Sequence, residues 1–502
     1  MNDDLMTRTE TRRTRALATL TAVEQTRLGQ FFTPERAAVL IAGLPRLPRA
    51  GRLRVLDPGA GVGSLAAALV HRVGAEAPAV HVEIVAVEVD SSVSSYLSQT
   101  MADCEESAAA KGGSVRTTVV TGDFLELSSG AFESAAALAD PFDLVIMNPP
   151  YAKLAANSAH RRALLRQGMD CPNLYAAFLA LGAAALTPGG QLVAITPRSF
   201  ANGPYFERFR KYLLRTIAID RLHTFESRST VFADTGVLQE NIVLSGTRDG
   251  ERDRVRLSVS QGHTDTAAEY LLDYDNLVRP GDPHKFLRIA AVGADVDVMS
   301  AMPASLPELG VAVSTGRVVD FRARENLRED ADEGCVPLIY PGNIRGGIVE
   351  WPRQMRKPQG FAVLDDSDRR LLVPSGCYVV VKRFSAKEER RRIVAGVWDP
   401  VSNGDTDVAF ENHLNVFHSR GAGLSRPLAV GLSLWLNSSA VDQFFRTFSG
   451  HTQVNATDLR SLRYPSVEAL RALGEGRSAT LPHQGEIDAL IDRFITGTGE
   501  AA

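Results

Sequence analysis

The sequence has few cysteines and no long apolar run, and these absences exclude several classes of protein. Its four cysteines lie far apart, with no CxxC pair and no histidine cluster that would complete a zinc site. We therefore expect neither a disulfide framework nor a bound metal ion. No run approaches the roughly 20 apolar residues of a membrane-spanning helix, and residues 1–28 lack the apolar core of a signal peptide. These features predict a cytoplasmic protein without a membrane partner.

Charge of one sign is not in excess either. The formal net charge is −4 over 502 residues, so the composition gives no overall signature of nucleic-acid binding. A nucleic-acid partner must therefore be argued from local patches. With 44% hydrophobic residues, the chain has enough apolar surface for two or three domains.

What the sequence does contain is an alternation of strand-like and helix-like runs between residues 52 and 244. The strand-like runs are LRVLD, VEIVAVEV, TTVVTGD, FDLVIMN, GQLVAIT and ENIVLSG. Helical runs such as SLAAALVHRV and LYAAFLALGAAAL lie between them. This rhythm predicts an α/β fold with a mostly parallel sheet covered on both faces. We expect a lead-in at 1–28, this α/β domain at 29–247, and a mixed domain at 248–502, where the rhythm is lost.

A glycine-rich turn, DPGAGVG at 57–63, joins the first strand-like run to a helix. Such a turn lets a ligand approach the backbone at the N-terminus of the helix. Ser64 stands where a dinucleotide fingerprint has its third glycine, which disfavours hydride chemistry. The turn therefore predicts a nucleotide-type cofactor of another kind.

Acidic residues end the next two strand-like runs. Glu88 is well placed to accept hydrogen bonds from two ribose hydroxyls, and Asp123 can accept from an adenine amine beside the ring of Phe124. A single acid at a strand end is usually a solvated loop residue. With Asp57, however, there are three in register on successive strand ends, which predicts one binding site.

The run FDLVIMN ends in a corner, Asn148-Pro149-Pro150-Tyr151. Proline cannot donate to a sheet ladder and it restricts the residue before it, so this corner is stiff and extended. At the carboxyl edge of a sheet, Asn148 and Tyr151 would face a ligand pocket. The alternative for any Asn-Pro pair is an ordinary strand-ending turn.

In chain order, GQFFTP, LDPGAGVGSL, VEVD, GDFLEL and NPPY resemble the successive motifs of γ-class, adenine-specific DNA methyltransferases. The likeness continues through ITPRSFANGPYF and FESRSTVFADTGVLQENIVL and covers residues 28–247. This part of the sequence resembles Type II restriction-modification methylases of the BsuBI/PstI (Eco57I) type. This resemblance implies a Rossmann-like class I domain that uses S-adenosylmethionine, followed by a mixed α+β target-recognition domain.

The resemblance also implies partners and site residues. Duplex DNA would be the substrate, and a restriction endonuclease acting on the same site would be the cognate partner. The implied cofactor residues are Phe32, Thr33, Pro34, Asp57, Gly59, Gly61, Glu88, Asp123, Phe124 and Asn148. The implied target-base residues are Asn148, Pro149, Pro150, Tyr151 and Phe232. For Phe232, a core phenylalanine that closes a strand is the alternative to a stacking role.

The chemistry of an adenine amine explains the need for such a corner. Its lone pair is delocalised into the ring, so acceptors such as the Asn148 side-chain oxygen and the Pro149 carbonyl must draw it back onto nitrogen. The base must also leave the duplex, at a cost of a few kcal/mol. Stacking on Tyr151 contributes roughly 1–3 kcal/mol toward that cost.

Other residues near these motifs allow two interpretations. Phe200 and Tyr205 are base-contact candidates that we expect to be packing residues, and Arg198 contacts a phosphate or is solvated. Twelve Lys or Arg and six Asp or Glu lie between Arg345 and Arg392, interleaved with aromatic residues such as Tyr378, which suggests a phosphate-tracking patch. For the run KEERRR at 387–392, a solvated helical face is the alternative. Gln453 and Asn455 resemble an element of target-recognition domains, and bracing that domain is their alternative role.

Three other functions are alternatives to DNA methylation. NPPY also serves methylation of RNA bases and of protein glutamine, but such enzymes are typically smaller and need no long C-terminal half. A binding module without catalysis is disfavoured because Asn148 and the glycine turn are both present. A fused nuclease is disfavoured because only about 28 residues precede the first motif, fewer than a domain needs.

Overall fold

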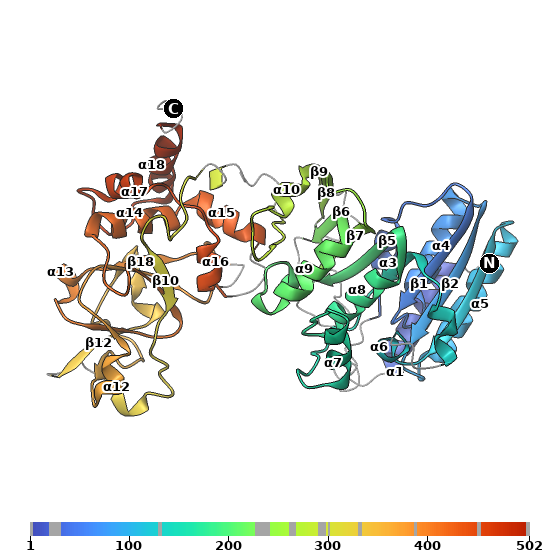
Figure 1. Ribbon diagram of the computed structural model, residues 1–502, viewed down its shortest axis with the longest axis horizontal. Helices are drawn as coiled ribbons and strands as arrows, with labels where there is room; N and C mark the ends of the chain where they lie inside the picture. Colours follow the sequence, from blue (N-terminus) through green and yellow to red (C-terminus); the bar gives the residue numbers. More distant parts are fainter. Residues whose placement is uncertain are drawn as a thin grey trace. The chain divides into compact units, whose positions relative to one another are not determined.

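The structure is a computed structural model that describes residues 4–19, 32–128, 133–225, 241–260, 268–289, 298–299, 302–329, 334–385, 389–448 and 453–497 (Figure 1). The chain divides into two compact units, Met1–Ile289 and Ala290–Ala502. In the described part of the chain, no helix is both long enough and apolar enough to cross a membrane.

A nine-stranded sheet organises the first unit, in the order β3-β2-β1-β4-β5-β7-β6-β8-β9. Its strands are β1 (Gly51–Pro58), β2 (Val80–Glu88), β3 (Ser114–Thr121), β4 (Phe142–Met147), β5 (Leu186–Pro197), β6 (Ile217–Phe225), β7 (Asn241–Arg248), β8 (Arg254–Ser260) and β9 (Ala268–Asp273). Strands β1 to β5 are parallel, and β7 enters antiparallel between β5 and β6. The carboxyl ends of β1 to β4 therefore meet at one edge, as the motif spacing predicts.

Helices cover both faces of this sheet, because its strands carry apolar residues on both sides. One apolar cluster packs the sheet against α1 (Leu5–Thr19), α3 (Glu35–Ala42), α4 (Ser64–Glu76) and α5 (Ser94–Ala110). The other packs it against α6 (Phe124–Leu127), α7 (Ala159–Arg166), α8 (Leu174–Ala185), α9 (Glu207–Thr216) and α10 (Tyr274–Leu277). Short 3-10 turns lie at η1 (Glu133–Leu138), η2 (Arg198–Ala201) and η3 (Pro204–Phe206). The predicted Rossmann-like α/β class is confirmed.

The first unit extends further along the chain than the sequence predicts, to Ile289 instead of Thr247. β8 pairs in parallel with β6, and β9 adds an antiparallel edge, so both strands continue the same sheet. After them, the amide of Leu287 donates to the carbonyl of Ala201, which keeps this segment on the first unit. The βα rhythm is lost at Thr247 because these edge strands follow one another without a covering helix.

The second unit contains two smaller sheets and a helical layer. The six-stranded sheet has the order β10-β20-β17-β18-β14-β13 and the five-stranded sheet β11-β15-β12-β19-β16. The strands are β10 (Ala312–Thr315), β11 (Leu327–Arg328), β12 (Cys335–Ile339), β13 (Ile344–Arg345), β14 (Ile348–Val349), β15 (Gly360–Ala362), β16 (Leu372–Val373), β17 (Tyr378–Lys382), β18 (Ala395–Trp398), β19 (Val408–Phe410) and β20 (Leu414–His418). The helices are α12 (Asp366–Arg369), α13 (Pro400–Asn403), α14 (Arg426–Leu436), α15 (Ser439–Phe448), α16 (Ala456–Arg460), α17 (Val467–Gly474) and α18 (Gln484–Gly497), with 3-10 turns η4 (Arg324–Asn326) and η5 (Pro341–Asn343). This is the predicted mixed α+β architecture.

Candidate functional site

A pocket of about 200 Å³ lies at the carboxyl ends of the parallel strands. Nine of the ten residues that the sequence suggests for a cofactor line it: Phe32, Thr33, Asp57, Gly59, Gly61, Glu88, Asp123, Phe124 and Asn148. Pro34 is the exception among them, because it is the N-cap residue of α3. The strand ends bring these residues together from a stretch of more than one hundred positions in the sequence.

The glycine turn donates its backbone N–H groups to β2 and not to the pocket. The amides of Gly59 and Ala60 both donate to the carbonyl of Val87, at 2.8 and 2.9 Å. The amide of Gly61 donates to Oε2 of Glu88 at 2.7 Å. A phosphate cradle needs free N–H donors, so this turn is unsuited to phosphate. It instead gives a ligand close access to the backbone.

Gly61 is required at its position for two reasons. Its φ of +57° is a left-handed conformation that residues with a Cβ rarely adopt. A Cβ there would also lie 2.8 Å from the ring of Phe32, which lines the same pocket. The turn and the aromatic ring are therefore packed as one wall.

Two buried carboxyl groups, those of Asp57 and Glu88, line the pocket. Oε1 of Glu88 accepts from the amides of Val89 at 3.0 Å and Asp90 at 2.9 Å, so most of its acceptor capacity serves the backbone. Asp57 is only 1% exposed, and neither of its side-chain oxygens has a hydrogen-bond partner among the described residues. Burial, together with the negative charge of Glu88, raises the pKa of Asp57 to about 8.

An unpartnered buried carboxylate is costly unless a ligand group pairs with it. Asp57 therefore favours a ligand with a cationic group, and the acceptors around it suit hydroxyl donors. The burial of Glu88 raises its pKa as well, although three backbone N–H groups oppose that shift. Together these residues fit a nucleoside that carries positive charge.

Aromatic rings form an apolar side of the pocket. The centroids of Phe124 and Phe178 lie 5.1 Å apart with their planes tilted by 52°. The sequence alone does not single out Phe178, because α8 is apolar around its whole circumference and no periodicity marks one face. A planar base can pack against such a pair of rings.

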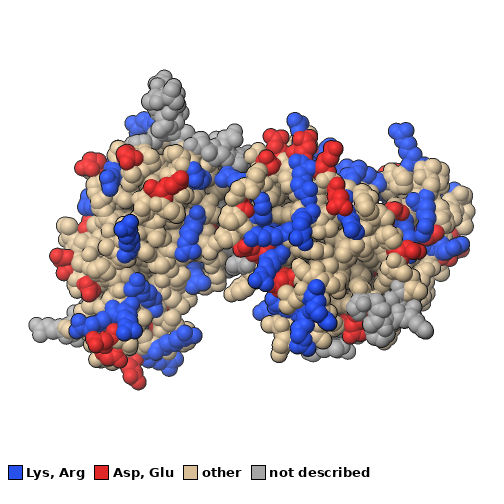
Figure 2. All heavy atoms as spheres, in the orientation of Figure 1, with Lys and Arg blue, Asp and Glu red and all other residues tan. Residues whose placement is uncertain are grey.

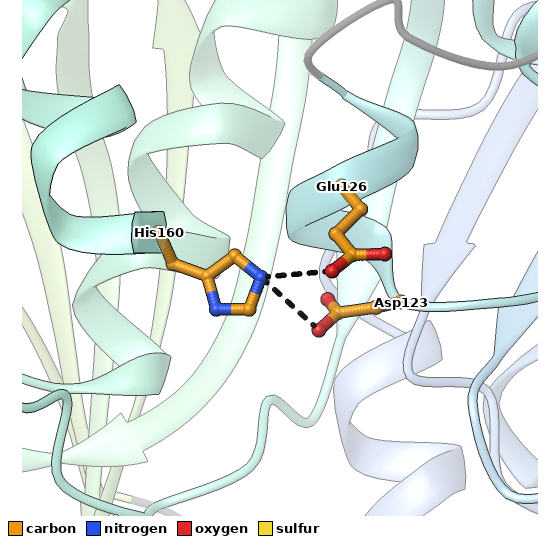
Figure 3. Close-up of side chains that lie close together, drawn as sticks. All are labelled: Asp123, Glu126 and His160. Atoms are coloured by element: carbon orange, nitrogen blue, oxygen red, sulfur yellow. Dashed lines mark hydrogen bonds and ion pairs between the residues drawn. The ribbon is translucent and has the colours of Figure 1, made fainter. Parts of the chain in front are cut away.

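Asp123 has two functions at the rim. Its Oδ1 accepts from the amide of Leu125 at 2.8 Å and so caps α6. Its Oδ2 lies 3.7 Å from Nε2 of His160, which is also 3.3 Å from Oε1 of Glu126 (Figure 3). The imidazole links α7 to α6 beside the pocket.

The stiff corner adjoins this pocket, and its amide is held from the N-terminal part of the chain. Nδ2 of Asn148 donates to Oγ1 of Thr33 at 3.1 Å. A Thr-Pro pair before a helix favours a threonine cap, but Thr33 does not cap α3. Pro34 occupies the N-cap position without any side-chain cap, and the Thr33 hydroxyl turns to Asn148 instead. In this orientation the side-chain oxygen of Asn148 is the atom left as acceptor.

The ring of Tyr151 is supported from behind by other aromatic residues. It meets the ring of Tyr175 edge-on, with centroids 6.3 Å apart and an interplanar angle of 87°. Tyr175 is stacked on Phe206 at 5.5 Å, and its hydroxyl lies 2.9 Å from Oγ of Ser199. The corner thus carries an ordered aromatic side chain beside the acceptor group.

Several predicted residues lie elsewhere. Phe232 falls outside the described residues. Phe200 is fully buried against Phe209, with centroids 6.0 Å apart, so it is a packing residue, whereas Tyr205 is 86% exposed and does not pack. Arg198 is neither solvated nor a surface phosphate contact, because it is buried and donates to the carbonyl of Ile289.

The basic run of the second unit is not one continuous surface. Tyr378 and Arg392 are fully buried, whereas Phe384 is 45% exposed. Asn455 forms a capping box with Asp458 at the start of α16, which is its bracing role. Only part of the predicted patch is therefore available to a ligand.

Comparison with known proteins gives related sequences over nearly the whole chain. Residues 110–232 match the protein family described as Eco57I restriction-modification methylase. The chain is 40% identical to the Type II methyltransferase M.BsuBI of Bacillus subtilis, over 93% of this chain and 94% of that protein. It is 37% identical to the Type II methyltransferase M.PstI of Providencia stuartii, over 96% and 95%.

Among solved structures, the Type IIL restriction-modification enzyme MmeI in complex with DNA resembles this chain in fold. The match covers 98% of this chain and 79% of that one, with a TM-score of 0.60 and 13% sequence identity. At that identity the match shows a shared fold that includes both units.

Proposed function

The chain belongs to the Type II restriction-modification methyltransferases, and from this premise we propose that it methylates the N6 amine of adenine in duplex DNA with S-adenosylmethionine as methyl donor. Membership of the family implies DNA methylation. The choice of amine, the cofactor contacts and the route of the base into the site are our proposals. They rest on the chemistry of the pocket and of the corner beside it.

The pocket fits the proposed cofactor group by group. When bound, S-adenosylmethionine supplies a methyl group on a sulfonium, which leaves as a neutral thioether. The unpartnered carboxylate of Asp57 would pair with the cationic amino-acid end, and Glu88 would accept from the ribose. Phe124 and Phe178 would hold the adenine ring, with Asp123 at its amine. Gly59 and Gly61 leave room for this ligand against the backbone.

The observation that carries the proposed reaction is the hydrogen bond from Asn148 to Thr33, because it presents the amide oxygen as an acceptor. That oxygen and the Pro149 carbonyl can accept the two N–H groups of the target amine. Two fixed acceptors favour the positive charge that develops on nitrogen during transfer. Rigid prolines keep these acceptors in place without reorganisation. The proton is then lost from the methylated amine to solvent, so the corner needs no strong base.

An amine inside a duplex cannot reach such a corner, so the base must rotate out of the helix. Tyr151 can stack on the extruded base. This step is part of the proposal, as are a cytoplasmic location, a recognition role for the second unit, and a restriction endonuclease that cuts the same unmodified site.

The first test is transfer of tritiated methyl groups from S-adenosylmethionine to plasmid DNA, total RNA and denatured protein in parallel. Labelled DNA would then be digested to nucleosides and separated. We expect label in duplex DNA, on N6-methyladenine, and a loss of at least about 100-fold in the Asn148→Ala variant.

Two outcomes would contradict the proposal. Label on N4-methylcytosine would refute the choice of adenine, since the same acceptors can hold either exocyclic amine. Label in RNA or protein, or full activity without Asn148, would refute the substrate or the catalytic corner. Cofactor affinity of Asn148→Ala, measured by calorimetry, separates a defect in catalysis from a defect in folding.

A further inference from the structure

The segment from Ala152 to Leu174 follows the corner directly, and its two ends lie side by side. Two backbone hydrogen bonds join these ends. The amide of Leu154 donates to the carbonyl of Pro172, and the amide of Leu174 donates to the carbonyl of Ala152. Leu174 itself lines the pocket. This segment, which contains α7 and is called the α7 segment below, is therefore attached next to the target-base corner.

This segment carries a net positive charge, and Asp170 is its one acidic residue in the sequence. Between Ala152 and Met169 it contains four Lys or Arg and no Asp or Glu: Lys153, Arg161, Arg162 and Arg166. Lys153, Arg162 and Arg166 are exposed and form no ion pair with any residue that the structure describes. Figure 2 shows Lys and Arg side chains on the visible face over α7 and α9.

Apolar residues hold the segment in place and leave these cations outside. Leu154, Leu164 and Met169 are buried in the core of the first unit. His160 ties the start of α7 to Asp123 and Glu126 at the pocket rim (Figure 3). These contacts set the direction of α7, together with a hydrogen bond from Nη1 of Arg162 to the carbonyl of Asn157 at 2.6 Å.

Within the residues that the structure describes, the carboxylates on or beside this segment face basic side chains. Asp123 and Glu126 face His160, and Asp170 faces two arginines. Asp170 pairs with Arg161 at 2.9 Å and lies 3.6 Å from Arg208, which is 79% exposed. Arg208 thus extends the positive surface from α7 onto α9. The one acidic residue of the segment is thus offset by two arginines, and the segment keeps a net positive charge.

A base held at the corner remains covalently joined to its own strand. The phosphates on either side of it must therefore lie at the mouth of the site, even when the base is out of the helix. Duplex DNA carries about one negative charge per 1.7 Å of helix. An exposed segment with a net positive charge, attached beside the corner, lies where those phosphates must pass.

We infer that the α7 segment is a phosphate-binding element that grips the DNA strand next to the extruded base, through Lys153, Arg162 and Arg166. This inference rests on the proposed function, because it needs a base at the Asn148 corner. The contacts carry no sequence information. They anchor the strand while the second unit, or any other part of the protein, reads the sequence.

The test is the salt dependence of DNA binding by the full chain, with the Arg162→Gln/Arg166→Gln double variant. A duplex that carries the methylated site, mapped from the activity above, would be titrated at several salt concentrations. Each phosphate contact contributes about 0.9 to the slope of log affinity against log salt, so the slope should flatten by about 2. Between about 50 and 200 mM salt, the variant should lose about tenfold less affinity than the wild type.

Three controls make the result specific. Arg49→Gln/Lys111→Gln removes two exposed cations that precede β1 and β3, at the opposite edge of the sheet, and should keep the wild-type slope. Arg162→Lys/Arg166→Lys retains the charges and should also keep it. Thermal melting and calorimetric binding of S-adenosylmethionine should be unchanged in all variants, which excludes a folding defect.

If the wild type methylates adenine and the glutamine variant keeps the wild-type slope, the phosphate-binding inference is wrong and the proposed function is unaffected. A flattened slope in the lysine variant would equally overturn it, because the effect would then come from helix packing. Failure of the wild type to methylate adenine would instead overturn the proposed function.

Discussion

The hydroxyl of Tyr151 donates a hydrogen bond to the side-chain oxygen of Asn148 at 3.2 Å. This oxygen is the atom that we propose as acceptor for the target amine. When no base is bound, the tyrosine hydroxyl therefore donates the hydrogen bond to Asn148 that we propose for the substrate N–H group. An incoming base must displace this hydroxyl before it can both bond to Asn148 and stack on the ring.

Tyr151→Phe should separate these two functions of the tyrosine. The variant keeps the ring and removes the competing donor, so the KM for duplex DNA should fall by about 2- to 10-fold at a similar kcat. Tyr151→Ala removes the ring as well and should lower kcat/KM by about 5- to 100-fold. Steady-state methylation of one duplex measures both. A Phe variant as impaired as the Ala variant would show that the hydroxyl takes part in the reaction.

Thr33→Val should lower kcat by about 2- to 10-fold, because the amide of Asn148 loses the partner that orients its oxygen. Thr33→Ser keeps a hydroxyl and should retain most of the activity. Since Thr33 also lines the cofactor pocket, the affinity for S-adenosylmethionine must be measured in both variants. If valine weakened cofactor binding and left kcat at saturation intact, Thr33 would act on the cofactor alone.

Binding of S-adenosylmethionine should release a proton from Asp57. Its pKa in the free protein is raised to about 8, so the carboxyl is largely protonated at neutral pH, and a cationic ligand favours the carboxylate. Affinity should therefore rise with pH, by up to about tenfold per pH unit, and level off above about pH 8. Calorimetry in buffers of different ionisation enthalpy counts the proton. Asp57→Asn should abolish the release, and a wild-type affinity independent of pH would contradict the assignment.

The same group makes a prediction for the stability of the protein without cofactor. Because the folded pKa lies above the ordinary value of 3.8, the folded protein holds a proton that the unfolded chain has lost. The stabilisation due to this proton is complete below about pH 4 and is lost as pH rises through about 8. The free energy of unfolding of the wild type, relative to Asp57→Asn, should decrease over that window. A constant difference would place the pKa near its ordinary value.

Gly61→Ala should weaken binding of S-adenosylmethionine by about tenfold or more, because its Cβ would lie 2.8 Å from the Phe32 ring and push it into the pocket. Gly112→Ala is a matched control. Its φ of +74° is also left-handed, but a Cβ there meets nothing within 4 Å. Both variants should lose some stability in thermal melts, and only the first should lose cofactor affinity by calorimetry. Equal affinities would exclude packing of Phe32 as the reason for the glycine.

Local patterns predicted the strands that form the site and the type of corner between them. The runs ending at Asp57, Glu88 and Asn148 are strands in the structure, because short apolar runs between turn residues have few other stable conformations. β6 was not among the predicted strands. Its apolar run is interrupted by Asp220, Arg221 and His223. The side chains of Asp220 and His223 find polar partners only once neighbouring strands are in place.

The sequence by itself determined the strands that end at the site, the stiffness of the Asn148 corner and the glycine turn. Proline and glycine restrict or release φ regardless of context. Tertiary structure alone decided which distant groups meet. Thr33 reaches Asn148 across 115 positions, and Phe178 faces the pocket from a uniformly apolar helix. Tertiary packing also decided that Arg198 and Tyr378 are buried. Such contacts depend on how whole elements pack, and no local pattern of residues encodes that packing.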